Sequence, residues 1–236
     1  MRQAGRRLLL PLPALLLPRT ALAEGRVFRP APGGLRGPEA AAGALVWAHA
    51  HYAEGAPPDP PPCLDRLTGW DRWRLDREGA RDPLEAGAAA LIAGCARLRA
   101  AGYGQVAVVG ESRGAFVALL ALRQPGLAEA MLLLAPAAHG TRPERRAEAL
   151  AAFEAACAAA APGAVRRGGL VLFAGDPYDP DPAARATAFT AGMARAGAGC
   201  LVIDRPPEPT GHGAARDAAF DARFGARLAA FLGGPG

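Results

Sequence analysis

The chain has 236 residues, 51% of them apolar, and this length and composition favour one domain with a core of ordinary size over two compact domains. The formal net charge is +5 at pH 7, but residues 1–23 hold four arginines and no acidic residue, which leaves residues 24–236 with a formal charge of +1. A nearly neutral chain without a clustered basic face gives no support to nucleic-acid binding.

The N-terminus has the three parts of a secretory signal peptide. Three arginines lie within the first seven residues, a leucine-rich stretch follows at 8–17, and Ala21-Leu22-Ala23 supplies a small-x-small cleavage site. Two prolines interrupt the apolar stretch, which is too short to span a bilayer as a helix. We therefore expect cleavage after Ala23, no stable membrane insertion afterwards, and a secreted or periplasmic protein whose single domain covers residues 24–236.

The first half of that domain opens with alternating strand and helix patterns. Residues 43–48 form an apolar run typical of a strand buried on both faces, and residues 70–75 read as the next strand. Between them, the proline-rich residues 55–63 are expected to form a surface loop. Residues 83–101 place apolar side chains at helical spacing after Asp82, which is expected to cap that helix.

The second half repeats the alternation more regularly. Strands are expected at 105–110, 130–135, 170–174 and 200–203, and helices from 113 to before 124, at 142–161, 182–196 and 217–232. Apolar strands that alternate with helices predict an α/β fold with a mostly parallel, doubly wound sheet and helices on both faces. Right-handed crossovers then bring the C-terminal ends of the strands to one edge of the sheet.

The sequence Gly110-Glu111-Ser112-Arg113-Gly114 lies where an apolar run passes directly into a helical pattern. A turn this sharp needs bare backbone on both sides of the serine, and it holds the serine at its tip, as in a nucleophile elbow. The amides at the start of the following helix face any negative charge that develops beside Ser112. Ser112 is also the only serine in the chain, which makes a chance occurrence of the motif less credible.

A serine nucleophile needs a histidine and a carboxylate beside it, and the sequence offers both at the same edge of the predicted sheet. A serine hydroxyl needs a base to attack an ester, and His212 follows the last predicted strand in a glycine-flanked loop. A carboxylate must orient that histidine, and Asp176 or Asp179 follows the preceding strand. Asp176 is preferred because it comes sooner after the strand; Asp179 serves instead if the strand is longer. The aspartate that is not used is expected to cap the next helix.

With Gly110 to Gly114 as a Gly-x-Ser-x-Gly elbow, followed in order by Asp176 and His212, the chain resembles the α/β-hydrolase superfamily over residues 43–232. Within it, the likeness is to serine esterases and dienelactone-hydrolase-like enzymes with a minimal cap. The resemblance implies an α/β-hydrolase fold and a cofactor-independent hydrolase that cleaves small-molecule esters through an acyl-enzyme. The alternative is a non-catalytic α/β-hydrolase-like domain used for binding.

The same resemblance implies an oxyanion hole. One donor would be the backbone N–H of Arg113, and the other an N–H of Ala50 or His51 in the loop after the 43–48 strand. His49-Ala50-His51 resembles the His-Gly pair of the family, with alanine in place of glycine. His49 has either a pocket or a structural role, and His139 is expected at the edge of the pocket.

The four cysteines, Cys63, Cys95, Cys157 and Cys200, leave two readings open. An oxidising compartment would permit two disulfides, whereas the apolar faces that carry Cys95 and Cys157 suit small buried core residues. The chain has no Cys-x-x-Cys and no cysteine spacing typical of zinc sites, so no metal site is expected.

Overall fold

The computed structural model describes residues 27–50, 58–77 and 83–234. Seven strands form one sheet in the order β1-β3-β2-β4-β5-β6-β7. The strands are β1 (Val27–Pro30), β2 (Gly43–Ala48), β3 (Trp70–Asp76), β4 (Val106–Glu111), β5 (Ala128–Leu134), β6 (Val165–Leu172) and β7 (Gly199–Asp204). All neighbouring strands pair in parallel except β1, which runs antiparallel to β3 at one edge. The mostly parallel sheet predicted from the sequence is confirmed.

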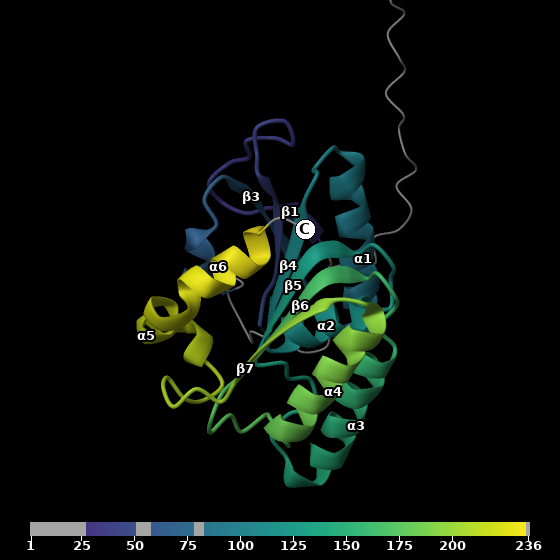
Figure 1. Cartoon of the computed structure of the whole chain (residues 1–236), viewed down its shortest axis with the longest axis vertical. Helices are drawn as coiled ribbons and strands as arrows, with labels where there is room; N and C mark the ends of the chain where they lie inside the picture. The colour runs from purple at the N-terminus through teal and green to yellow at the C-terminus, as the bar shows by residue number, and fades with distance from the viewer. Residues whose placement is uncertain (1–26, 51–57, 78–82, 235–236) are drawn as a thin grey trace, which may run out of the picture.

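Helices cover both faces of the sheet, as predicted (Figure 1). One face carries α1 (Leu84–Ala100), α2 (Arg113–Ala121), α3 (Arg146–Ala158) and α4 (Pro182–Ala196). The other carries the short helix η1 (Pro62–Arg66) and the C-terminal helical run α5 (Ala218–Phe220), η4 (Asp221–Gly225) and α6 (Ala226–Gly233).

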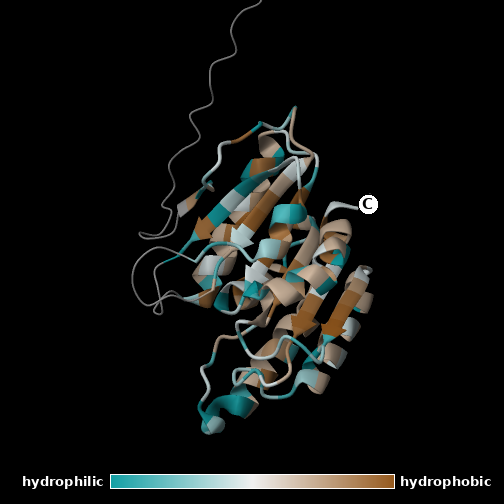
Figure 2. Ribbon diagram, turned by 90° about the vertical axis from the view of Figure 1, so that its left-hand side faces the viewer, coloured by the Kyte–Doolittle hydropathy of each residue, from teal (hydrophilic) through white to brown (hydrophobic). Residues whose placement is uncertain are grey.

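The two faces enclose two separate apolar clusters, and this explains the continuous apolar runs of the strands. Val46 lies in the cluster under α1 and α2, whereas its neighbour Trp47 lies in the cluster under α6. Every residue of β2 and of β4 is buried. Figure 2 shows the hydrophobic residues concentrated in the strands. A strand covered on both sides needs apolar residues at every position rather than at alternate ones.

Most element boundaries agree closely with the sequence, and the main differences are in α3 and β6. The helix predicted at 142–161 is divided into the short helix η2 (Pro143–Arg145) and α3, which ends at Ala158. β2 and α4 have the predicted bounds, but β6 begins five residues before the predicted Leu170. Gly168 and Gly169, which interrupt the apolar pattern, lie directly against side chains of other elements. A Cβ atom at Gly168 would lie 2.2 Å from Sδ of Met193, and one at Gly169 would lie 2.9 Å from Cδ1 of Leu132.

Two other predictions need correction. The proline-rich segment is not wholly a surface loop, because Pro62 begins η1 and Cys63 is buried in the cluster beneath α6. The single C-terminal helix predicted at 217–232 is interrupted by a π-helical turn over Asp221–Gly225. The predicted cap Asp82 lies outside the described residues.

All four cysteines lie in the described part of the chain and carry free thiols, so the structure contains no disulfide among them. Cys63, Cys95 and Cys157 are buried, and burial raises the pKa of each thiol to about 12. Cys200 is exposed. The burial of Cys95 and Cys157 fits the reading of these two as small core residues, and Cys63 is buried as well. In residues 27–50, 58–77 and 83–234, no helix is both long and apolar enough to cross a membrane.

Candidate active site

Ser112 lies at the tip of a sharp turn between β4 and α2. Its φ of 53° falls in the left-handed region that residues other than glycine rarely adopt. The turn is held by three backbone hydrogen bonds: Ser112 N–H donates to the Leu134 carbonyl at 2.9 Å, and the Ser112 carbonyl accepts from Phe116 and Ala137 at 3.1 Å each. The serine is therefore fixed at the C-terminal edge of the sheet, between β4 and β5.

The two glycines of the motif permit two different close approaches. A Cβ atom at Gly110 would lie 2.6 Å from the backbone N and Cα of Ala115, so this glycine lets α2 turn back onto β4. A Cβ atom at Gly114 would lie 1.9 Å from the carbonyl oxygen of Ala48. Gly114 therefore lets the loop after β2 pass directly beside the start of α2, which brings Ala50 to the serine.

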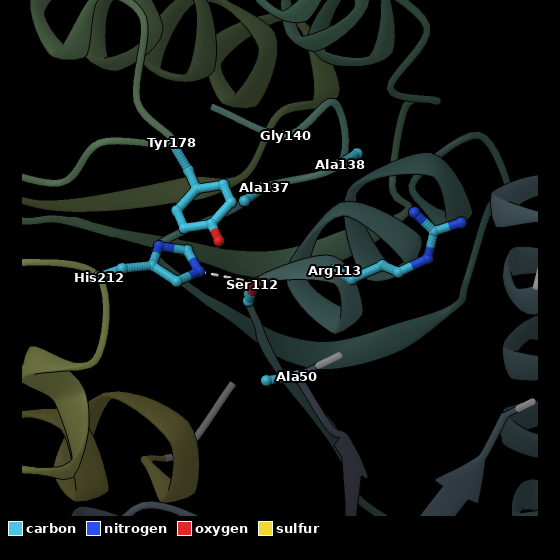
Figure 3. Close-up of a pocket in the computed structure, with 8 residues that line it drawn as sticks. All are labelled: Ala50, Ser112, Arg113, Ala137, Ala138, Gly140, Tyr178 and His212. Atoms are coloured by element: carbon cyan, nitrogen blue, oxygen red, sulfur yellow. Dashed lines mark hydrogen bonds between the residues drawn. The ribbon is translucent and has the colours of Figure 1, made fainter. Parts of the chain in front are cut away.

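The structure brings Ser112, His212 and Asp176 into one hydrogen-bonded chain. Figure 3 shows its first link, between Ser112 and His212. Nε2 of His212 lies 2.8 Å from Oγ of Ser112, and Nδ1 lies 2.9 Å and 3.0 Å from the two carboxylate oxygens of Asp176. Because a carboxylate accepts hydrogen bonds, this contact places the imidazole proton on Nδ1 and leaves Nε2 to accept the serine proton. The histidine loop is anchored to the sheet by Gly211, whose N–H donates to the Ala174 carbonyl at 2.8 Å.

Asp179, the alternative acid, pairs with Arg185. The side chain of Asp179 is 2% exposed, and its carboxylate lies 3.5 Å from Nε of Arg185, whose side chain is 1% exposed. Arg185 also donates to the Pro136 carbonyl at 2.8 Å and lies over the ring of Phe153. The prediction that the unused aspartate caps α4 is wrong, since Asp181 accepts the capping hydrogen bond from Ala184 N–H at 2.9 Å.

A cavity of about 370 Å³ opens in front of the serine. Its walls are mostly small: Ala137, Ala138 and Gly140 lie on one side of Ser112 and Ala50 on the other (Figure 3). The ring of Tyr178 covers His212, with ring centroids 4.3 Å apart. The backbone N–H of Tyr178 also donates to Asp176 at 2.8 Å, which helps to fix the acid.

The loop after β2 is held by buried side chains. His49 is 1% exposed, and its Nδ1 donates to the Ala50 carbonyl at 2.7 Å. The buried Arg77 donates to the His49 carbonyl. Burial lowers the pKa of His49 to about 4, so its imidazole is neutral at physiological pH. His49 therefore has a structural position beneath the loop, while Ala50 reaches the cavity and His51 lies outside the described residues.

His139 lies beside the site rather than in it. It lines a second cavity of about 430 Å³ that shares Arg113 and Ala138 with the first. Burial lowers its pKa, and its ring packs edge-on against Phe116. Within the described ranges, no group of three or more His, Cys, Asp or Glu side chains is placed to hold a metal ion.

One pair of residues beside the site has no signal in the sequence. Glu111, which precedes the serine, forms a two-pronged ion pair with Arg216, four residues after His212. The motif identifies neither partner. Position 111 is a variable position of Gly-x-Ser-x-Gly, and Arg216 lies between the loop that carries His212 and the helix predicted at 217–232. The pairing depends on a contact between residues 105 positions apart.

No protein-family model matches the chain, and no curated protein sequence matches it. Similarity is found among solved structures. A prolyl endopeptidase aligns with 82% of this chain at 18% identity and a TM-score of 0.59, but the chain spans only 34% of that enzyme. Brefeldin A esterase, described as a bacterial homologue of human hormone-sensitive lipase, aligns with 96% of this chain and 80% of its own at 14% identity and a TM-score of 0.56.

An esterase of Pyrococcus furiosus is similar over 81% of this chain and 82% of its own, at 13% identity and a TM-score of 0.54. At these identities the alignments establish a shared arrangement of strands and helices. They do not by themselves transfer an activity or a substrate to this chain.

Proposed function

We propose that this chain, which has the α/β-hydrolase fold, is a serine hydrolase that cleaves carboxylic esters or related acyl bonds through an acyl-enzyme. The observation that carries the proposal is the continuous hydrogen-bonded chain from Ser112 through His212 to Asp176. The esterases among the structural neighbours are consistent with it. Acyl transfer through Ser112 and His212 requires no cofactor.

In the first half-reaction, Oγ of Ser112 attacks the acyl carbon while Nε2 of His212 takes its proton. Asp176 keeps the other ring nitrogen protonated and stabilises the imidazolium as it forms. His212 then gives its proton to the departing alkoxide, which leaves as an alcohol. In the second half-reaction, His212 takes a proton from water, the hydroxide attacks the acyl-serine, and the acid is released as Ser112 regains its proton.

The negative oxygen that forms in both steps needs hydrogen-bond donors. We assign one donor to the backbone N–H of Arg113, the first residue of α2, whose amides point toward the tip of the elbow. We assign the other to the loop at Ala50, which lies across the cavity from Tyr178 (Figure 3). The carbonyls of His49 and Ala50 are held by buried side chains, and this fixes the orientation of their peptide groups.

The test is covalent labelling with a fluorophosphonate probe, followed by an ester panel. We expect wild-type protein to be labelled at Ser112 and to hydrolyse simple esters, and Ser112→Ala to lose labelling and to lose about 10⁴-fold or more in kcat. Ser112 is buried, and the substitution removes only its hydroxyl oxygen, so the variant should keep its fold. Correctly folded wild-type protein that is not labelled would instead support the binding-domain alternative.

We also propose that residues 1–23 act as a cleaved export signal, which would make this a secreted or periplasmic enzyme. N-terminal sequencing of protein from the native host should begin at Glu24. An intact Met1 terminus in the mature protein would contradict export by cleavage.

A further inference from the structure

The buried Glu111 and the half-buried Arg216 form an ion pair next to the proposed catalytic residues. Glu111 is 3% exposed, and its two carboxylate oxygens accept from Nε of Arg216, at 2.9 Å, and from Nη2. The third nitrogen of the guanidinium, Nη1, donates to the Asp59 carbonyl at 2.8 Å. A guanidinium that uses all three nitrogens in this way holds a fixed geometry, unlike a mobile surface pair.

The pair joins three segments that are distant in sequence. Glu111 ends β4 and immediately precedes Ser112. Arg216 ends the short helix η3 (Ala214–Arg216), which begins two residues after His212. Asp59 belongs to the segment that leads into η1. The ion pair therefore connects the segment after His212 to the end of β4, directly before Ser112. It is a second contact between these segments, in addition to the hydrogen bond between His212 and Ser112.

The pair also sets the charge beside the imidazole. Burial raises the pKa of Glu111, while Arg216 and His212 act in the opposite direction. A carboxylate that interacts with His212 electrostatically would favour its protonated form, and an unpaired guanidinium there would disfavour it. Other groups that face this region are the Cys63 thiol, whose pKa of about 12 keeps it neutral, and the ion pair of Arg66 with Asp221; Asp65 lies near Cys63 and pairs with Arg72. The groups in contact with His212 itself are Asp176 and Tyr178.

We infer that Glu111 and Arg216 are positioning residues for His212: together they hold the histidine segment against the nucleophile strand and cancel the charge that either would place beside the imidazole. This inference rests on the proposed function, since it assigns a partner to the proposed base. Neither side chain contacts Oγ of Ser112 in the structure. The pair should therefore control the pH dependence and the rate of turnover separately, through charge and through geometry.

The charge is tested by Glu111→Gln, which keeps the shape of the side chain and leaves the Arg216 cation beside His212. The expected result is that the acidic limb of the kcat/KM profile moves to lower pH by about 0.5 to 1 unit, because the cation opposes protonation of the imidazole. The double variant Glu111→Gln, Arg216→Gln removes both charges, and its limb should return to the wild-type pH. A residue that only supported the fold would not produce this pattern of shift and return.

The geometry is tested by Arg216→Lys, which keeps the positive charge and loses the two-pronged contact. The acidic limb should stay at the wild-type pH while kcat falls about 10-fold or more with little change in KM, because the histidine is less well placed. The double variant should lose kcat similarly. It leaves no unpaired buried charge, so it tests the inference even if Glu111→Gln alone does not fold. Thermal unfolding of each variant serves as the control for folding.

The outcomes separate this inference from the proposed function. An acidic limb that does not move in folded Glu111→Gln, or that moves to higher pH, would overturn the charge role. Wild-type kcat in both Arg216→Lys and the double variant would overturn the positioning role. In each case fluorophosphonate labelling of wild-type Ser112 would leave the proposed function intact, whereas a wild type without labelling removes the basis of both.

Discussion

Asp176 and Asp179 are separated by only three positions, yet the structure gives them different surroundings. Asp176 lies against Nδ1 of His212 and accepts the Tyr178 N–H. Asp179 faces the buried guanidinium of Arg185, and burial raises its pKa although Arg185 opposes the rise. The sequence favoured Asp176 from its distance to the strand, but the role of Asp179 could not be predicted because Arg185 is an ordinary arginine on an amphipathic helix.

Substitution of the two aspartates by asparagine should therefore affect different properties, kcat for Asp176 and the free energy of unfolding for Asp179. Asp176→Asn should lower kcat by about 10⁴-fold with a small effect on stability, because the amide favours the wrong imidazole tautomer. Asp179→Asn should retain most of its kcat but lower the free energy of unfolding by about 3 kcal/mol, because it leaves the buried charge of Arg185 unpaired. Ester hydrolysis and urea unfolding measure the two effects. The reverse pattern would show that Asp179 is the acid.

At the scale of elements, the regular strands could be predicted from the sequence, but the start of β6 and the π-helical turn could not. Apolar runs revealed β2, β4 and β5 because strands covered on both faces exclude polar residues. The start of β6 was missed because its glycines make room for Met193 and Leu132, which approach from distant elements. The π-helical turn could not be predicted either, because it depends on a contact with a distant residue. Asp221, which begins the turn, forms an ion pair with Arg66, and a Cβ atom at Gly225 would collide with the carboxylate of Asp221.

The elements around the serine also suggest how an acyl group is accommodated. The cavity in front of Ser112 and the second cavity, which lies between the start of α1, the side of α2 and α3, share Arg113 and Ala138. The second cavity is lined largely by apolar side chains, among them Leu84, Phe116 and Leu120. An acyl chain that passes Ala138 would bury its methylene groups there.

If the proposed ester hydrolysis holds, kcat/KM of the wild-type protein should be higher for medium-length esters than for acetyl esters, with each methylene buried in the second cavity contributing up to about 0.8 kcal/mol. Ala138→Leu narrows the junction, so it should lower kcat/KM for hexanoyl esters more than for acetyl esters. The exposed Ala191→Leu on α4 is the matched control and should leave both unchanged. Equal losses for the two esters in Ala138→Leu would show that the acyl chain takes another path.

On the scale of the whole molecule, the sheet accounts for why distant residues could be placed from the sequence. Ser112, Asp176 and His212 each follow a strand in a parallel sheet, and all such strand ends meet at one edge. Topology therefore predicted which residues meet, but not the contacts that fix them. The ion pair of Glu111 with Arg216 joins elements far apart in the chain, and that of Asp179 with Arg185 joins a loop to the helix that follows it.

The same burial makes the stability of the whole fold depend on pH. The pKa of His49 falls from an ordinary value of 6.5 to about 4 because burial disfavours its charged form. The hydrogen bond to the Ala50 carbonyl and the charge of Asp76 oppose this fall, while Arg77 and Arg74 add to it. Between these values the unfolded chain binds more protons than the folded one. The contribution of His49 to the free energy of unfolding is therefore fully present above about pH 6.5 and is lost as the pH falls toward 4. Between pH 7.5 and 5 this loss amounts to about 2 kcal/mol.

His49→Asn isolates this contribution, because asparagine does not titrate and its amide can still donate to the Ala50 carbonyl. Urea unfolding at about pH 7.5 and pH 5 should show a smaller loss of stability on acidification in the variant than in the wild type. His139, whose pKa is also lowered, acts in the same direction, while Glu111 and Asp179, whose pKa values are raised by burial, act in the opposite one. All three are present in both proteins and cancel in the comparison, so equal losses in the two proteins would show that His49 is not the group that titrates.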